Sequence, residues 1–206
     1  MKLVVFGATG PSGRAVVRRA LAAGHGVRAF VRNPLAADLA GAEVVSGDVL
    51  QPESVVRAVT GTDVVISTLG QGSSNKPTTV MSTGTGAILD AMAATGVTRL
   101  VCMTSRGGFR DPSEPFAFRV FGRWLYGNIF ADHQRVEAKV LQSNVEWTLV
   151  RPTSLTNGPH TGRYRADREA ARAGWKKMSR ADVADFIVNE INTGAYRNAA
   201  VCLGGM

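Results

Sequence analysis

Cysteine is scarce in this sequence, which has 206 residues and only two cysteines, Cys102 and Cys202. Each lies inside an apolar, strand-like run, where a free thiol behaves as a small hydrophobic side chain. Two isolated cysteines provide neither a disulfide framework nor the ligand set of a structural zinc site. We therefore predict a protein without disulfides and without a metal site.

Long hydrophobic runs are also missing. The first apolar run, Leu3 to Phe6, stops at Gly7 and is too short for the apolar core of a secretion signal. No stretch approaches the roughly 20 apolar residues that a membrane-spanning helix needs. These absences predict a cytoplasmic protein that does not act at a membrane.

A concentrated basic surface is absent although the net charge is +8, from 24 Lys and Arg against 16 Asp and Glu. The basic residues are scattered, with short pairs at Arg18-Arg19 and Lys176-Lys177. Nucleic-acid-binding proteins of such charge usually cluster it and interleave aromatic residues, so we predict no nucleic-acid partner. The excess charge either attracts an anionic cofactor and substrate or forms a generally basic, solvated surface.

A glycine-rich turn at residues 7–13 is the strongest local pattern that is present. It reads Gly-Ala-Thr-Gly-Pro-Ser-Gly, follows the apolar run 3–6 and precedes a helical pattern over 14–21. A strand, a tight turn and a helix N-terminus together direct backbone N–H groups and a positive dipole end at one point, which suits a phosphate. Gly7 permits the sharp exit from the strand, Gly10 permits close approach of a pyrophosphate, and Gly13 permits close helix packing. In this context the turn predicts dinucleotide binding.

The rest of the chain alternates strand-like and helical patterns, which indicates one α/β domain over residues 1–206. We predict a doubly wound, Rossmann-type, mainly parallel sheet with helices on both faces, and a ligand crevice above the carboxyl ends of the first, fourth, fifth and sixth strands. A short helix is expected within 34–40 and a loop over 157–177. The strands expected are 3–6, 27–31, 43–45, 63–69, 99–105, 147–150 and 199–203, and the main helices are 14–21, 51–60, 77–95, 129–141 and 180–192, the last capped by Ser179.

The end of the second strand indicates which cofactor is used. An Asp or Glu usually binds a free ribose 2′-hydroxyl there, but this sequence has Arg32. Arginine favours a 2′-phosphate through its charge and planar hydrogen-bonding geometry. We therefore predict NADP as the cofactor; the alternative is that Arg32 only projects into water.

Other predicted cofactor contacts follow the carboxyl ends of later strands, where ligands lie in such sheets. Asp48 follows the third strand and is expected near the adenine, with a turn-forming role as the alternative. The full set of predicted cofactor-binding residues is Gly7, Thr9, Gly10, Pro11, Ser12, Gly13, Arg32, Asp48, Val49, Leu69, Gly70, Thr104 and Pro152.

Two further features concern the substrate. Residues 106–127 are rich in Gly, Pro, Arg and aromatics, and we interpret them as an insertion that covers the site, or as an amphipathic helix over 116–126 that packs on the body. His133 falls near the apolar face of its helix, as either a core histidine or a substrate contact. Ser105, at the end of the fifth strand, is the predicted hydrogen-bond donor in the reaction, with His133 as the second predicted catalytic residue.

With these residues in place, the chain resembles the atypical short-chain dehydrogenase/reductase group, and within it the biliverdin-IXβ reductase/flavin reductase type and the NmrA-like NAD(P)-binding proteins. The resemblance runs over nearly the full length, and the short motifs that carry it are 7–13, Val31-Arg32, 47–50, the Pro-Thr-Thr-Val-Met-Ser run at 77–82, Thr104-Ser105, Asp132-His133 and 161–164. It implies NADPH-dependent reduction of flavins or linear tetrapyrroles by a monomeric protein.

One common motif of the wider superfamily is missing. A Tyr-x-x-x-Lys pair lowers a phenol pKa for proton transfer, but Phe130 follows Tyr126 at that spacing and Arg168 follows Tyr164. Two functions remain open. The first is a reductase of aromatic acceptors, in which Ser105 orients without ionising. The second is a non-catalytic, NmrA-like sensor of NADP(H) that signals through a partner.

Overall fold

The computed structural model describes residues 1–34, 39–72, 76–106, 123–168 and 175–206. Two expected features fall largely outside these ranges, namely the short helix within 34–40 and the aromatic segment 106–127. The last residues of that segment, 123–127, form the start of helix α4 (Arg123–Leu141). The helical interpretation of the segment therefore holds for its C-terminal end.

Eight strands of the described chain form one sheet in the order β3-β2-β1-β4-β5-β6-β10-β8. Neighbouring strands pair in parallel, except β10 and β8, which are antiparallel. The first six positions follow the order of a dinucleotide-binding sheet, with the reversal between β1 and β4. The bounds are β1 Lys2–Phe6, β2 Gly26–Val31, β3 Glu43–Ser46, β4 Val64–Ser67, β5 Arg99–Met103, β6 Glu146–Pro152, β8 Tyr164–Asp167 and β10 Ala199–Gly205.

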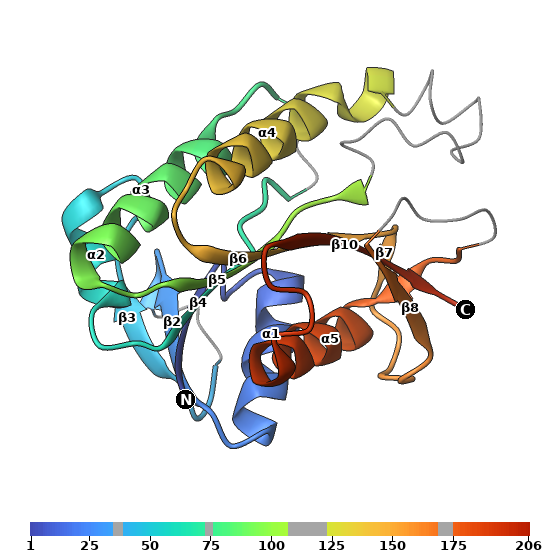
Figure 1. The fold of residues 1–206 in the computed structure, drawn as a ribbon, viewed down its shortest axis with the longest axis horizontal. Helices are drawn as coiled ribbons and strands as arrows, with labels where there is room; N and C mark the ends of the chain where they lie inside the picture. Colours follow the sequence, from blue (N-terminus) through green and yellow to red (C-terminus); the bar gives the residue numbers. More distant parts are fainter. Residues whose placement is uncertain (35–38, 73–75, 107–122, 169–174) are drawn as a thin grey trace.

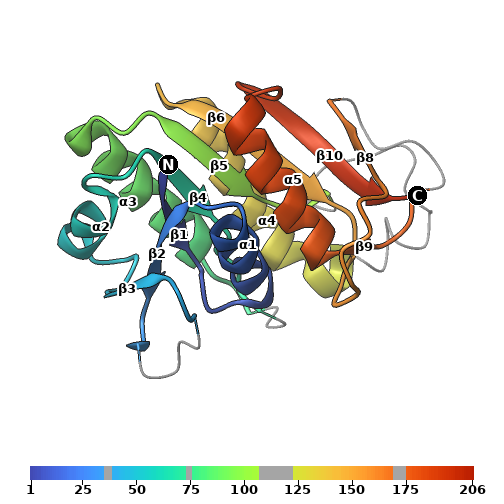
Figure 2. The ribbon, with the colours of Figure 1, turned by 90° about the horizontal axis from the view of Figure 1, so that it is seen from below.

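Helices cover both faces of the sheet, which confirms the doubly wound prediction (Figure 1). One face carries α1 (Pro11–Ala22) and α5 (Arg180–Thr193), which lie side by side in Figure 2. The other face carries α2 (Pro52–Val59), α3 (Val80–Thr95) and α4. All five run back from the carboxyl edge of the sheet, because parallel strands need crossover connections.

The core explains why the central strands read as unbroken apolar runs. Leu3, Val4, Val5 and Phe6 of β1 have no exposed surface. Leu3 and Val5 pack in the cluster under α1 and α5, whereas Val4 and Phe6 pack in the cluster under α2, α3 and α4. Because successive side chains of a strand point to opposite faces, a sheet covered on both sides needs apolar residues at every position.

The structure corrects one expected loop. Residues 164–167, within the segment predicted as a loop, form β8 and pair antiparallel with β10, with Tyr164 opposite Gly205 and Asp167 opposite Cys202. The sequence Tyr-Arg-Ala-Asp lacks a strand pattern, because an edge strand needs backbone pairing on one side only and its side chains remain partly solvated. A separate two-stranded sheet, β7 (Leu155–Thr156) with β9 (Met178–Ser179), was likewise not predicted.

Candidate functional site

The glycine turn connects β1 to α1 at the carboxyl edge of the sheet. Gly7 has φ +77°, and a Cβ atom there would lie 2.6 Å from the carbonyl oxygen of Thr68, the residue after β4. A Cβ atom at Gly13 would lie 2.2 Å from the Gly7 oxygen. Both glycines are therefore required by the packing of the protein itself, as the sequence predicted for a strand exit and a close helix.

Gly10 differs from the other two glycines. A Cβ atom there would meet only the Gly7 oxygen, at 3.3 Å, and the backbone is extended, with φ −68° and ψ 159°. This contact is tight, but it is much milder than the backbone clashes that a Cβ atom would make at Gly7 and Gly13. A glycine that the protein does not need for packing is what a closely approaching pyrophosphate requires.

The N-terminus of α1 is open to an anion. Its N-cap residue is Gly10, which provides no side-chain hydrogen bond, and the first turn contains no acidic residue. The N–H groups of the first turn of a helix have no partners within the helix, and here they lie with the positive dipole end at the carboxyl edge of the sheet. Thr9 and Pro11 are exposed beside them, while Ser12 is buried. This end of α1 fits the phosphates of a dinucleotide.

The adenine side of the predicted site is formed after β2 and β3. Arg32 is exposed directly after β2, and within the described ranges its guanidinium has no hydrogen-bond or ion-pair partner. The Asp48 carboxylate accepts a hydrogen bond from the Leu50 N–H at 2.9 Å, so it shapes the turn after β3. Val49 is buried against Gly84 of α3, where a Cβ atom would lie 2.9 Å from its methyl groups. Of this group, Arg32 is the side chain that is available to a ligand.

The segment after β4 lies beside the glycine turn. Thr68 donates hydrogen bonds from its N–H and its hydroxyl group to the Phe6 carbonyl, both at 2.9 Å. Leu69 is half-buried and Gly70 is exposed. The positions predicted after β4 therefore stand at the switch point of the sheet, next to Gly7.

A buried network that the sequence analysis missed joins the ends of β5 and β6. Glu137 of α4 is 2% exposed, and its Oε1 accepts hydrogen bonds from Thr104 Oγ1 at 2.6 Å and from Arg151 Nε at 3.0 Å. Its Oε2 forms an ion pair with Arg151. The Thr104 N–H also donates to the Val150 carbonyl at 2.8 Å. An acidic residue on the apolar face of the helix, between Val136 and Val140, is the signal in the sequence that pointed to such a partner.

Asp132 and His133 precede Glu137 on α4. The Asp132 carboxylate has no exposed surface and accepts hydrogen bonds from the Met81 N–H at 3.1 Å and from Ser82 Oγ. It therefore caps α3, whose first residue is Val80 and not Pro77 as predicted. This contact brings together two of the motifs on which the family resemblance rests.

His133 lies one helical turn before Glu137 and so on the same face of α4. Its Nδ1 atom is buried and has no hydrogen-bond partner among the described residues. Burial lowers the pKa of His133 to about 4, although the neighbouring Asp132 acts in the opposite direction. The imidazole is therefore neutral at physiological pH.

Ser105 follows Thr104 and is half-buried at the carboxyl end of β5. Its hydroxyl group makes no hydrogen bond within the described ranges, in contrast to the Thr104 hydroxyl. Pro152, the last residue of β6, is buried beside Arg151. The predicted donor is thus available at the edge where the next strand also ends.

These residues lie along a single edge, because the strands that carry them are adjacent and parallel in the order β2-β1-β4-β5-β6. Neighbouring strands are about 4.8 Å apart, so Arg32 and Pro152 mark two ends about 19 Å apart. A 2′-phosphate at Arg32 and a pyrophosphate at the turn leave the ends of β4, β5 and β6 for the nicotinamide half. The residues present therefore fit an NAD(P) dinucleotide.

Tyr164, at the start of β8, does not have the surroundings of a proton-donating phenol. Its hydroxyl group donates to Asp185 Oδ2 at 2.9 Å, and burial together with this carboxylate raises its pKa to about 12. A phenol activated for proton transfer needs a lowered pKa instead. Tyr164 is therefore a structural residue between β8 and α5.

No group of three or more His, Cys, Asp or Glu side chains within the described ranges is arranged to hold a metal ion. None of the helices in the same ranges is both long and apolar enough to cross a membrane.

Comparison with curated proteins finds relatives of several kinds. A photosystem II assembly factor, Ycf39 of Trieres chinensis, is 31% identical over 77% of this chain and 47% of its own length. The chain spans about half or less of the assembly factors that it matches. A Bacillus subtilis protein described as an uncharacterized sugar epimerase, YhfK, is 27% identical over 97% of this chain and 92% of its own.

Solved structures share the fold over nearly the whole chain. ChuY of Escherichia coli O157:H7, described as an anaerobillin reductase, superposes with a TM-score of 0.83 at 23% identity, over 100% of this chain and 97% of its own. A short-chain dehydrogenase/reductase of Veillonella parvula in complex with NADP gives a TM-score of 0.79 at 19% identity, over 98% and 94%. The sequence itself matches the NAD(P)H-binding family over residues 7–193, which is most of its length, so the chain belongs to this NAD(P)H-binding family.

Proposed function

We propose that this protein is an NADPH-dependent reductase that delivers a hydride to planar, conjugated acceptors such as flavins and linear tetrapyrroles. One observation carries the proposal: Ser105, whose hydroxyl group makes no hydrogen bond within the described ranges, follows β5 at the edge where an alcohol dehydrogenase would need an activated phenol, and the imidazole of His133 on α4 is neutral. Tyr164 is bound to Asp185 instead, with a raised pKa. Such a site supplies oriented donors and no strong acid.

The preference for NADPH rests on Arg32. Its exposed guanidinium follows β2, where a carboxylate would select a free ribose hydroxyl. A planar cation binds a phosphate through several N–H groups at once. The Veillonella relative in complex with NADP has the same fold and supports this choice.

The bound cofactor supplies the hydride, and the protein orients the acceptor. Ser105 donates a hydrogen bond either to an acceptor oxygen or to the nicotinamide amide, and it does so without ionising at neutral pH. Neutral His133 offers an N–H group to an acceptor carboxylate or phosphate. The proton that completes the reduction comes from water, so no protein group needs to titrate. Orientation and close stacking account for most of the acceleration.

The acceptor class is supported by two sources. The motifs at 77–82, 104–105 and 132–133 resemble the biliverdin and flavin reductases, and in this structure Asp132 ties the first motif to the third. ChuY, which is described as an anaerobillin reductase, has the same fold over the full chain.

The test is to mix the purified protein with NADPH and either FMN or biliverdin and to follow the nicotinamide absorbance. We expect oxidation of NADPH with at least one acceptor and slower oxidation of NADH. The Gly10→Val variant is the control, because it should lose cofactor binding and with it the activity. A wild-type rate equal to that of this control with every acceptor would refute the proposed reduction.

A second function is favoured by the relatives themselves. The photosystem II assembly factors among them are named for assembly and not for catalysis. A protein of this kind would bind NADP(H) at the same turn and report its redox state to a partner. The two proposals separate in the assay above, since a sensor binds NADPH and leaves its absorbance unchanged.

A further inference from the structure

We propose that Glu137 is a positioning residue for the nicotinamide half of the bound dinucleotide, acting through Thr104 and Ser105. The proposal rests on the proposed placement of the cofactor along the carboxyl edge and not on the identity of the acceptor. Glu137 touches no ligand in this assignment. It holds two strand ends, after β5 and at the end of β6, in one arrangement.

The geometry of the carboxylate supports this role. An ionised carboxylate only accepts hydrogen bonds, at about four lone-pair positions. Glu137 uses them for the Thr104 hydroxyl group and for two nitrogens of Arg151. A threonine has few side-chain rotamers because it is β-branched, so a hydroxyl group held at 2.6 Å also fixes the orientation of the Thr104 backbone.

Ser105 is the next residue, and its direction depends on that backbone. The Thr104 N–H donates to the Val150 carbonyl and the Thr104 hydroxyl group donates to Glu137. The backbone and the side chain of the residue that precedes Ser105 are therefore both fixed. Oriented donors are effective because they need no reorganisation when the ligand binds. Loss of the Glu137 carboxylate would release this turn while leaving the glycine turn and Arg32 untouched.

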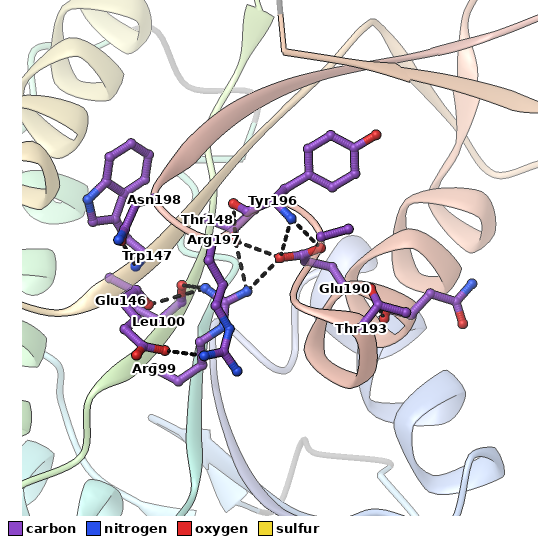
Figure 3. Close-up of polar contacts among 12 residues, drawn as sticks. Arg99, Leu100, Glu146, Trp147, Thr148, Glu190, Thr193, Tyr196, Arg197 and Asn198 are labelled. Carbon is purple, nitrogen blue, oxygen red and sulfur yellow. Dashed lines mark hydrogen bonds and ion pairs between the residues drawn. The ribbon is translucent and has the colours of Figure 1, made fainter.

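A second buried glutamate provides a matched comparison. Glu190 of α5 accepts hydrogen bonds from Arg99 Nη2 at 2.8 Å and from Thr148 Oγ1 at 3.0 Å, and it is also 2% exposed. Figure 3 shows this network, with the Tyr196 N–H as a further donor. Its partners lie at the start of β5 and within the first half of β6, toward the amino edge of the sheet. Glu190 thus has the same chemistry as Glu137 away from the predicted cofactor edge.

The Glu137→Gln substitution removes the charge with little change in shape. A glutamine amide has one oxygen and one NH₂ group, so its NH₂ group would face a nitrogen of Arg151, donor against donor. Either Arg151 or the Thr104 hydroxyl must then move. We expect the affinity for NADPH to fall fivefold to tenfold, which is the order of one lost oriented hydrogen bond.

The experiment compares two ligands on the full chain by calorimetric titration. NADPH has both halves, whereas adenosine 2′,5′-bisphosphate has the adenosine and the 2′-phosphate only. Glu137→Gln should weaken NADPH binding fivefold to tenfold and change the bisphosphate affinity by less than twofold. Glu190→Gln should lower the thermal unfolding midpoint and change neither affinity by more than twofold.

A double-mutant cycle tests the route through Ser105. In the Ser105→Ala background, Glu137→Gln should weaken NADPH binding by less than twofold more. If Glu137→Gln does not fold, Thr104→Val removes the hydroxyl donor, leaves the ion pair intact and should reproduce the selective loss for NADPH.

Three results would overturn the proposal: equal weakening of both ligands, unchanged affinity for both, or additive effects in the cycle. The outcome depends on the proposed placement of the cofactor but not on the proposed reduction of an acceptor. A wild-type protein that reduces no acceptor, and whose Glu137→Gln variant still loses NADPH selectively, refutes the reductase and supports the positioning role.

Discussion

The glycine turn allows a test in which one substitution should mainly lower stability and another should mainly lower cofactor affinity. At Gly13 a new Cβ atom would lie 2.2 Å from the Gly7 oxygen and 2.8 Å from the Ala8 Cα atom, both backbone atoms that cannot rotate away. Overpacking of this kind costs about 3 kcal/mol at the upper end of its range. Alanine regains about 1 kcal/mol over glycine within a helix. Gly13→Ala should therefore lose about 2 kcal/mol of unfolding free energy, or about 4–8 °C in the unfolding midpoint for a chain of this size.

Gly10→Val should behave differently. The new Cβ atom would meet only the Gly7 oxygen, at 3.3 Å, and the extended backbone accepts a β-branched residue. Loss of a glycine N-cap costs about 0.5–1 kcal/mol, which is about 1–4 °C. The side chain would fill the space of the pyrophosphate, so the affinity for NADPH should fall at least about 100-fold, or about 2.8 kcal/mol.

The two variants are compared by thermal unfolding without ligand and by titration with NADPH. Titration of Gly13→Ala is carried out well below its unfolding midpoint, so that its binding reflects the folded state. The reasoning fails if Gly10→Val binds NADPH like the wild type, because the cofactor would then lie elsewhere on the sheet. It fails equally if Gly10→Val loses as much stability as Gly13→Ala, because Gly10 would then serve packing.

Three further predictions concern single side chains. Arg32→Asp should remove or reverse a preference for NADPH over NADH that is at least about tenfold, or 1.4 kcal/mol, in the wild type; equal wild-type affinities in titrations would show that Arg32 does not select the cofactor. Ser105→Ala should lower the reduction rate about tenfold or more, as expected for one lost oriented donor, and His133→Ala should lower it less. If the rate instead follows one ionisation near pH 6.5 and is lost in His133→Ala, the mechanism is general acid catalysis. Burial lowers the pKa of His133 to about 4, so the unfolded chain takes up a proton at a higher pH than the folded protein does. The unfolding free energy should therefore decrease as the pH falls from about 6.5 toward 4. In denaturant titrations across this range His133→Gln should lose less unfolding free energy than the wild type, and identical losses would contradict the assigned burial.

The sequence by itself determined the architecture, because the relevant signals are local. Unbroken apolar runs indicate strands covered on both faces, and residues 7–13 provide the turn that such a sheet uses at its first crossover. Ser179 was predicted to cap the last helix, and its hydroxyl group accepts the Asp182 N–H at 3.0 Å. Strand ends and helix caps depend on a few neighbouring residues, so they can be read without the rest of the fold.

Only the tertiary structure decided how the part of the site at the ends of β5 and β6 is built. Thr104, Glu137 and Arg151 are separated by 33 and 14 residues along the chain, and they meet only because α4 packs over the ends of β5 and β6. The start of α3 likewise depends on Asp132, 51 residues away from Met81, and β8 exists because β10 offers it a backbone edge. The position of Glu137 on the apolar face of its helix signals that a buried partner exists, but the sequence does not show which distant residues provide it.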